Sequence, residues 1–403
     1  MDTLEKGKTI NRKRINDYTA KYAPKKVLII GNGFDLAHGL LTDYRDFLKI
    51  MKDPDDFLKY YEIKKGKPHV GVYDSNNQWN RYLEDTEKSD VLEINKMVNI
   101  LKTNSWAQYY AKCNAEIEGW VDFEREMQPV IDMFNSIISS GSKCIGSGDN
   151  ACAFLRLNDI GIERTAKLWP KYIQDVRSCG DNLQGIYVTV ESYYSDTQYG
   201  VIKHKMLRDL SADLDEFVNA FCIYLKELVE TKEDIDLIGL FETMDVSDII
   251  SFNYTDTYYN YHSSLRNATV HYIHGSTLNN DSEKMIFGVN RVKDDAEYLF
   301  KVFEKRYQRL CNNYKQTYKD IVENGNYELV IYGHSLDITD KAILEPLLKG
   351  ANNSTVYCYK NADGYSDRNI KIKNLMLLLG DEAVEEMLYN EKIVLKELDF
   401  QNT

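Results

Sequence analysis

The sequence contains no paired cysteine motif. Its seven cysteines are widely spaced, their number is odd, and no two of them form a CxxC pair. They are Cys113, Cys144, Cys152, Cys179, Cys222, Cys311 and Cys358. This pattern argues against both a disulfide framework and a zinc ribbon. We therefore expect no metal cofactor and a reducing, cytoplasmic compartment.

A long hydrophobic run and an excess of positive charge are also missing. The longest apolar run, near Leu375 to Leu379, is a fragment of the roughly 18 residues that a membrane helix needs. The 50 Lys and Arg residues against 63 Asp and Glu give a net charge of −13, which disfavours a nucleic-acid binder held by global charge. No apolar signal-peptide core follows Met1. We expect neither a membrane nor a nucleic acid as a partner.

Six short apolar runs indicate β-strands. They cover residues 27–30, 249–252, 270–273, 285–287, 329–332 and 356–359, and a further run at 393–395 is ambiguous. Several are followed by glycine or a polar turn and then by helix-like sequence. A chain of 403 residues, 43% of them hydrophobic, is long enough for two or three domains or for one enlarged domain. We predict an α/β fold with a Rossmann-like, mostly parallel sheet.

A long stretch with helical patterning separates the first run from the second. Leu214, Phe217 and Phe221 recur at helical spacing, and Asp213 with Glu216 indicates a capping box at the start of that helix. All four tryptophans lie in this stretch, which predicts a core of its own: Trp79, Trp106, Trp120 and Trp169.

These patterns predict a sheet domain that is interrupted by an insertion. We expect an N-terminal tail at 1–24, a Rossmann-like domain at 25–60 plus 240–403, and an α-helical insertion domain at 61–239. A Ser- and Gly-rich segment at 139–150 is the one flexible-looking part of the insertion. Ligands of doubly wound sheets bind beyond the carboxyl ends of the strands, so functional residues should follow the apolar runs directly.

The first such motif is Gly31-Asn32-Gly33-Phe34-Asp35-Leu36-Ala37-His38-Gly39. Glycines at this turn let backbone amides approach a pyrophosphate at a helix N-terminus. The third glycine of the dinucleotide fingerprint is replaced by Leu36, so a merely tight turn is the alternative. The sequence has no GxxxxGK[ST], which leaves a P-loop ATPase unsupported.

Two further strand ends carry polar side chains. Asn253 can hold a hydroxyl or a water with its amide, although a strand-end Asn often caps its own turn. His274 can serve as a general base near neutral pH, although a single His is usually structural. His271, inside a predicted strand, is expected to be structural.

The last strand-end motif is Gly333-His334-Ser335-Leu336-Asp337. It is similar to the nucleophile elbow GxSxG of α/β-hydrolases, but Asp337 stands where that motif has glycine. The hydrolase order also needs a His after the Ser, and no His follows Ser335. A hydrolase triad is therefore disfavoured.

The insertion contains one candidate site of its own. Trp120, Asp122 and Glu124 fall in a run where Asp122 and Glu126 share a helical face at i and i+4. A charged, solvated helix face is the alternative.

Taken together, these motifs resemble the bacteriophage abortive infection family AbiH. Five motifs carry the resemblance in order: residues 31–40, 120–124, 252–255, 273–275 and 333–337. The similarity runs from about residue 26 to 345. Leu41 departs from it, because the family usually has Pro after the Gly-Leu pair.

AbiH proteins in turn resemble remote sirtuin-type NAD enzymes. The resemblance maps the sirtuin glycine loop onto Gly31 to Asp35, with Asp35 in place of Ser, and the Gln-Asn motif onto Phe252-Asn253. It maps His-Gly onto His274-Gly275 and Gly-Thr-Ser onto 333–335. The sirtuin zinc module is absent, so NAD cleavage rather than deacylation is the implied chemistry.

The resemblance implies a bacterial antiphage protein that hydrolyses NAD to nicotinamide and ADP-ribose during infection. Asn253, His274 and Asp35 would be catalytic. The implied cofactor-binding residues are Gly31, Asn32, Gly33, Phe34, Gly39, Gly275, Gly333, His334, Ser335 and Asp337. Expected partners are NAD or a related nucleotide and a phage-encoded trigger, with self-association left open. The alternatives are a non-catalytic nucleotide sensor and a hydrolase of another nucleotide derivative.

Overall fold

The computed structural model describes residues 23–66, 77–83, 86–113, 123–139, 150–156, 165–169, 173–178, 185–191, 203–233, 235–278, 284–292, 298–312, 317–360 and 364–399. The chain divides into two compact units. The sheet unit comprises residues 1–39, 236–273 and 315–403, and the insertion unit comprises residues 40–235 and 274–314. The chain therefore leaves the sheet unit twice, once after β1 and once after β6.

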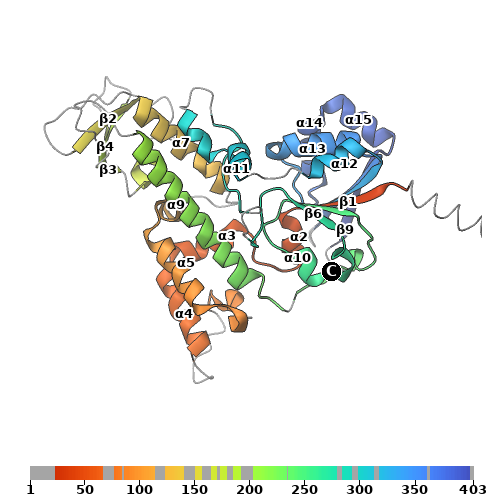
Figure 1. The fold of residues 1–403 in the computed structure, drawn as a ribbon, viewed down its shortest axis with the longest axis horizontal. Helices are drawn as coiled ribbons and strands as arrows, with labels where there is room; N and C mark the ends of the chain where they lie inside the picture. The colour runs from red at the N-terminus through yellow and green to blue at the C-terminus, as the bar shows by residue number, and fades with distance from the viewer. Residues whose placement is uncertain are drawn as a thin grey trace, which may run out of the picture. The chain divides into compact units, whose positions relative to one another are not determined.

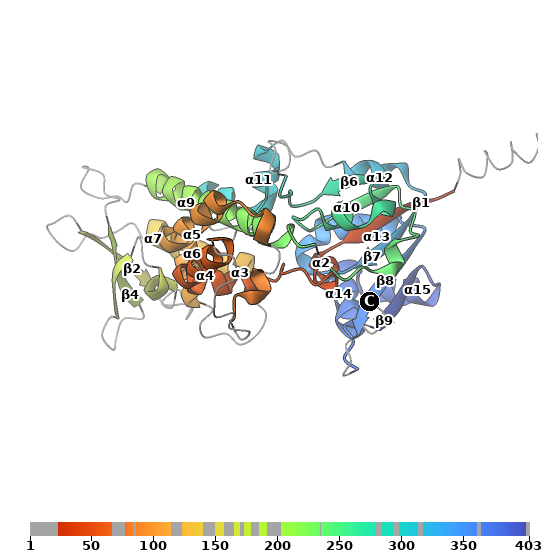
Figure 2. The same ribbon diagram turned by 90° about the horizontal axis from the view of Figure 1, so that it is seen from below.

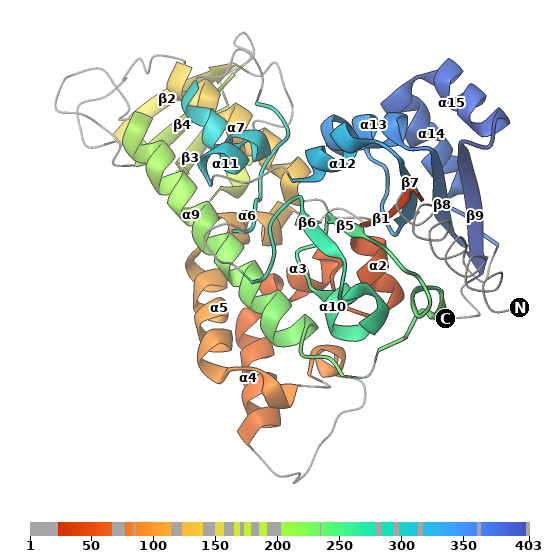
Figure 3. The same cartoon turned by 45° about the vertical axis from the view of Figure 1, so that its right-hand side comes forward.

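The sheet unit is built on six parallel strands in the order β6-β5-β1-β7-β8-β9 (Figure 3). Their bounds are β1 Lys25–Ile30, β5 Asp248–Ser251, β6 Thr269–Tyr272, β7 Tyr327–Tyr332, β8 Asn353–Lys360 and β9 Ile393–Asp399. The predicted α/β fold with a parallel sheet is confirmed. The run at 393–395 forms the edge strand β9.

Helices cover the sheet from both faces, which explains the uninterrupted apolar strands. One face packs against α12 Tyr318–Asn324, α13 Lys341–Gly350, α14 Arg368–Leu379 and α15 Asp381–Tyr389. The other packs against α2 Asn32–Ala37, α10 Thr257–Tyr261 and the short turn η4 Gly239–Phe241. Val27 and Ile29 face the first core and Leu28 and Ile30 the second, all at most 1% exposed.

The insertion unit combines helices with a small antiparallel sheet (Figures 1 and 2). Its helices are α3 Tyr44–Lys52, α4 Pro54–Gly66, α5 Val91–Thr103, α6 Ser105–Cys113, α7 Phe123–Ser139, α9 Lys203–Tyr224 and α11 Lys305–Cys311. Its strands are β2 Asn150–Arg156, β3 Ile173–Ser178 and β4 Gly185–Glu191, in the order β2-β4-β3. The helical pattern of the sequence predicts only helices for this insertion, and the small sheet departs from that prediction.

Short helical turns complete both units. The 3-10 turns are η1 Asn80–Tyr82, η2 Thr86–Lys88, η5 Ser263–Leu265, η6 Tyr298–Phe303 and η7 Ile338–Asp340, and η3 Leu225–Val229 is a π-helical turn. Within the described residues, no helix has the length and apolar character needed to cross a membrane.

The patterned helix around Leu214 is confirmed as α9, but its predicted capping box is wrong. The helix begins upstream at Lys203, so Asp213 lies in its interior. The Asp213 carboxylate accepts a hydrogen bond from the Ser105 hydroxyl at 2.7 Å. It thus ties α9 to α6 rather than starting a helix.

The predicted tryptophan core is present for the described tryptophans. Trp79, Trp106 and Trp169 are each at most 1% exposed, and the rings of Trp106 and Trp169 meet edge to face at 5.0 Å. Trp120 and most of the segment 139–150 lie outside the described residues.

The predicted strand at 285–287 is wrong, because a side chain takes the place of a neighbouring strand. The run lies in the insertion unit, where Gln308 accepts from the Phe287 N–H at 3.1 Å and donates to the Phe287 carbonyl at 2.9 Å. The Ile286 N–H donates to the His274 carbonyl at 2.7 Å. A buried apolar run therefore forms here without a ladder.

Removing a buried leucine from α13 tests this account of the core. Leu347 is fully buried against the sheet, so Leu347→Ala is expected to lower the free energy of unfolding by about 2–5 kcal/mol. Leu377 on α14 is 51% exposed, so Leu377→Ala should cost less than about 1 kcal/mol. Urea unfolding measures both, and equal losses would contradict the packing described.

Candidate functional site

The order in which strands are added to the sheet reverses between β1 and β7. The chain passes from β1 to β5 and β6 on one side, whereas β7, β8 and β9 extend the sheet on the other side. The connections that leave β1 and β7 therefore run to opposite faces, and ligands of doubly wound sheets bind at such a point of the carboxyl edge. The predicted motifs at 31–35 and 333–337 meet at this point.

The two loops are joined backbone to backbone. The Gly33 N–H donates to the Gly333 carbonyl at 2.8 Å, and the Gly31 N–H donates to the Tyr332 carbonyl at 3.3 Å. A Cβ atom on Gly31 would lie 2.8 Å from the His334 Cα, and one on Gly33 would lie 2.8 Å from the Gly333 Cα. Close packing of the loops is thus one reason for these glycines, and it occupies the Gly33 amide.

Gly333 has the tightest position of the three. Its φ is +68°, and a Cβ atom there would lie 2.1 Å from the Phe34 nitrogen. Both the left-handed backbone and the missing side chain are needed for the contact.

Asp35 is the buried acid of the site. Its side chain is enclosed in the sheet unit, and Oδ2 accepts a hydrogen bond from the Thr255 hydroxyl at 2.5 Å. Burial raises the pKa of Asp35 to about 7, while the bond from Thr255 opposes the rise. Oδ1 has no hydrogen-bond partner among the described residues. The carboxyl therefore changes its charge near neutral pH, a range that favours general acid–base catalysis.

Asn253 lies beside Asp35. Its amide donates to the Gly31 carbonyl at 3.1 Å, and its N–H donates to the Ser251 hydroxyl at 3.2 Å. It is close enough to Asp35 to lower the pKa of that carboxyl. The structure thus brings together Asp35, Asn253 and the glycine loop, as the sequence motifs predicted.

His274 and Gly275 follow β6 along the chain but belong to the insertion unit. His274 is buried, and Gly275 packs so closely on the segment after 283 that a Cβ would lie 2.4 Å from the Lys284 carbonyl oxygen. His271, inside β6, is bonded to Asp248 at 3.1 Å and to Thr317 at 2.6 Å, in keeping with its predicted structural role.

The loop after β7 holds four predicted residues. His334 accepts from the Leu336 N–H through Nδ1 at 2.9 Å, and its Nε2 lies 3.6 Å from the Asp340 carboxylate. Asp337 caps η7 by accepting from the Thr339 N–H at 2.9 Å. Ser335 is exposed and receives no bond from His334. A Ser–His pair of the hydrolase type is therefore not formed here.

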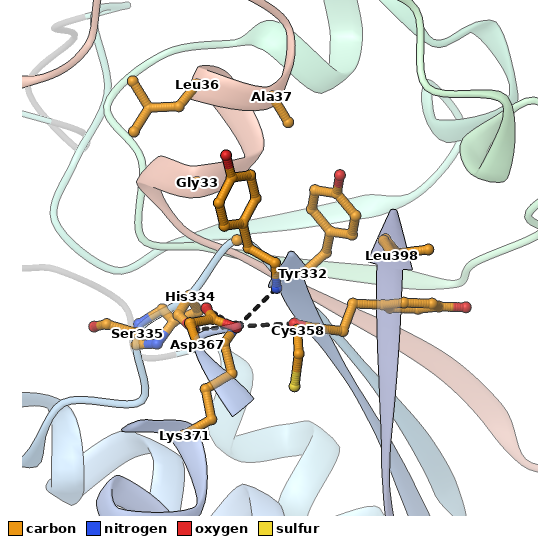
Figure 4. Close-up of a pocket in the computed structure, with 13 residues that line it drawn as sticks. Gly33, Leu36, Ala37, Tyr332, His334, Ser335, Cys358, Asp367, Lys371 and Leu398 are labelled. Carbon is orange, nitrogen blue, oxygen red and sulfur yellow. Dashed lines mark hydrogen bonds and ion pairs between the residues drawn. The ribbon is translucent and has the colours of Figure 1, made fainter. Parts of the chain in front are cut away.

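A cavity of about 460 Å³ opens beside these loops, within the sheet unit (Figure 4). Its walls come from α2, the loop after β7, the ends of β8 and β9, and the start of α14. The lining residues that sequence reasoning missed are Leu36, Ala37, Tyr332, Tyr357, Cys358, Tyr359, Asp367, Lys371 and Leu398. Their only sequence signal is position, because most of them lie within predicted strands or within the glycine motif.

A pair of histidines was also missed. His38 and His262 are buried with their Nε2 atoms 2.6 Å apart, and His38 Nδ1 lies 2.6 Å from the Phe34 carbonyl oxygen. Burial lowers the pKa of His38, and burial followed by the charge of His38 lowers that of His262 to about 4. Both are neutral at pH 7, and the bond links the end of α2 to the end of α10.

The insertion candidate is only partly described. Trp120 and Asp122 lie outside the described residues, whereas Glu124 lies in the first turn of α7 and pairs with the buried Lys305 at 2.6 Å. Glu124 also lies 3.5 Å from the Gly288 N–H. Among described residues, no group of three or more His, Cys, Asp and Glu side chains is arranged to hold a metal ion.

A family model described as bacteriophage abortive infection AbiH matches residues 27–360. The chain belongs to this family. The resemblance found in the motifs is confirmed, and it places the chain among proteins of bacteriophage abortive infection. No curated protein and no solved structure matches the chain. The similarity to sirtuins therefore stays a prediction.

The loop packing of this AbiH chain is tested by adding one methyl group at either of two glycines. Gly333→Ala is expected to cost at least about 3 kcal/mol, from left-handed strain of about 1–2 kcal/mol plus the clash with Phe34. Gly364→Ala has a similar φ of +82° but open space, so it should cost only about 1–2 kcal/mol. Equal losses in urea unfolding would argue against tight loop contact.

The raised pKa of Asp35 predicts how stability varies with pH. The folded protein holds the proton more tightly than the unfolded chain, so this group costs stability increasingly as pH rises from about 4 to about 7, and the cost is constant above. Asp35→Asn removes the buried charge, which in the wild-type protein lowers the free energy of unfolding by up to about 4 kcal/mol. The variant also buries an unpaired amide, which lowers that free energy by about 1–3 kcal/mol. The variant should be about 1–3 kcal/mol more stable at pH 8 and lose that advantage at pH 5. A difference that does not change with pH would refute the raised pKa.

Proposed function

We propose that the sheet unit binds NAD at the carboxyl edge of β1, β5 and β7 and hydrolyses its nicotinamide–ribose bond during abortive infection. The observation that carries the proposal is the placement of a titratable, buried Asp35 beside Asn253 at the switch point of a parallel sheet. Nucleotides bind at this edge of doubly wound sheets. The family assignment supports the defence role, and the adjoining cavity supports a ligand of nucleotide size.

The proposed reaction is a displacement at the anomeric carbon. Water attacks C1′ of the ribose, the bond to the pyridine nitrogen breaks, and nicotinamide leaves as a neutral molecule. The transition state resembles an oxocarbenium ion, which a nearby carboxylate stabilises. Asp35 supplies that carboxylate in its ionised form, and Asn253 orients the water or a ribose hydroxyl. The role of His274 as the base that takes the proton from water rests on the sequence motif.

Incubation of the purified protein with NAD tests the proposal directly. Nicotinamide and ADP-ribose are expected as products, and Asn253→Ala or His274→Ala should lower the rate at least about 100-fold. Asn260→Ala on the exposed surface of α10 is the matched control and should keep the rate. An undiminished rate in either site variant would overturn the role proposed for the replaced residue.

The rate should also follow the charge of Asp35. Because the carboxylate is the active form, hydrolysis is expected to rise as pH increases through about 7 and then to level off. Asp35→Asn should lose most of the activity and also this limb of the pH profile. A wild-type rate that is flat between pH 6 and 8 would contradict the role of Asp35.

A non-catalytic nucleotide sensor is the second candidate function. It is favoured by one observation: Asp35 and Asn253 are 1% and 5% exposed, and neither lines the cavity. A nucleotide held in the cavity would then act by binding alone. Tight retention of NAD without products would support the sensor, and products from a different nucleotide alone would support a different hydrolase.

A further inference from the structure

The cavity has two chemically different ends. In Figure 4 the apolar Leu36 and Ala37 lie at one end, whereas Asp367 and Lys371 lie at the other, with Tyr332 between them. A single ligand that fills this space needs a flat apolar part and a polar part.

Two tyrosines give the cavity an aromatic wall. The rings of Tyr332 and Tyr357 are 5.9 Å apart with a tilt of 52°, and Leu36 is 40% exposed although it lines the cavity. Burial raises the pKa of both tyrosines, that of Tyr332 to about 12, so both phenols are neutral at pH 7. Bases stack on such aromatic faces without strong sequence preference.

The polar end presents a carboxylate rather than a free cation. Lys371 is the cation among the described lining residues, and its side chain is 4% exposed. Its ammonium donates to the carbonyls of His334 at 3.2 Å and Tyr357 at 2.9 Å, and it lies 3.4 Å from the Asp367 carboxylate. The ammonium is therefore held by two backbone carbonyls and one carboxylate of the protein.

Asp367 is fixed but still open to a ligand. Its Oδ1 accepts from the Tyr359 N–H at 2.7 Å, and its own N–H donates to the Tyr359 carbonyl at 3.1 Å. The side chain is 27% exposed, and a carboxylate has about four lone-pair sites, so acceptor capacity remains. Such a carboxylate can accept from a pair of hydroxyl donors, whereas a phosphate at the same place would bring further negative charge beside the single ammonium of Lys371.

We propose that this cavity is a ribonucleoside site in which Asp367 selects a free ribose diol and rejects a 2′-phosphate. The base stacks on Tyr357, with Tyr332 tilted beside it, and the 2′- and 3′-hydroxyls donate to Asp367. The inference rests on the proposed function for its ligand, and it names the substrate as NAD rather than its 2′-phosphorylated form.

The test compares the binding of ADP-ribose and 2′-phospho-ADP-ribose by calorimetry. The wild-type protein should bind ADP-ribose at least about tenfold more tightly. Asp367→Asn keeps an acceptor for Tyr359 but removes the charge, so the preference should fall below about threefold. Glu345→Gln, which removes the same charge from the exposed face of α13, should keep the full preference. Melting curves establish that each variant is folded.

A second pair of variants tests the stacking end. Tyr357→Leu should weaken ADP-ribose about tenfold without changing the preference between the two probes. Tyr389→Leu, at a residue 87% exposed at the end of α15, should have no effect. These two expectations separate base stacking from recognition of the ribose.

Turnover is measured separately with NAD. A tenfold binding preference without hydrolysis would uphold the site and overturn the proposed NAD cleavage. Equal binding of the two probes by the wild-type protein, or failure to bind either, would overturn the site, even if NAD is hydrolysed. Retention of the preference in Asp367→Asn would overturn the role of Asp367.

Discussion

The contact between the loops after β1 and β7 is the constraint on which the candidate site depends. The hydrogen bond from Gly33 to Gly333 and the absence of three Cβ atoms let the two backbones touch at the switch point. The loop after β1 holds Asp35 and accepts a hydrogen bond from Asn253, whereas the loop after β7 lines the cavity. Any side chain between the loops would push these two halves apart, because packed interiors have little free volume.

The glycine motif also shows how one pattern can have two physical causes. A GxG turn after a strand is typical of a phosphate-binding loop, since bare backbone can approach a pyrophosphate, or of a merely tight turn. In the folded chain the bare backbone approaches another loop, and the Gly33 amide is already hydrogen-bonded. The phosphate groups of a nucleotide would then have to bind to other residues along the carboxyl edge of the sheet. Sequence alone does not distinguish the two causes, because both need the same missing side chain.

Much of the fold was predictable because parallel strands are buried on both faces. Runs such as 27–30 and 329–332 have no polar alternation, and they are β1 and β7. The run at 285–287 has the same composition, but Gln308 supplies its hydrogen bonds. The partner of a short apolar run is set by tertiary structure, and that information is not local.

The candidate site was predictable only in part. Polar residues directly after strands were found by position, and Asp35 and Asn253 do lie together. Tyr357, Asp367 and Lys371 were missed because they have no motif and meet only after β8 and α14 pack side by side. The pKa of Asp35 was equally out of reach, since it depends on complete burial rather than on neighbours in sequence.

The order of the strands has a consequence for the time at which the site forms. β1 is an interior strand, but both of its neighbours, β5 and β7, are made from residues after 247. During synthesis the first strand must wait for most of the chain before either edge is paired, and such distant pairing is slow. The candidate site therefore exists only once residue 335 has been translated and folded back. A nascent chain that ends before β7 lacks it, so a ligand of this edge would find its site only on chains that are almost finished.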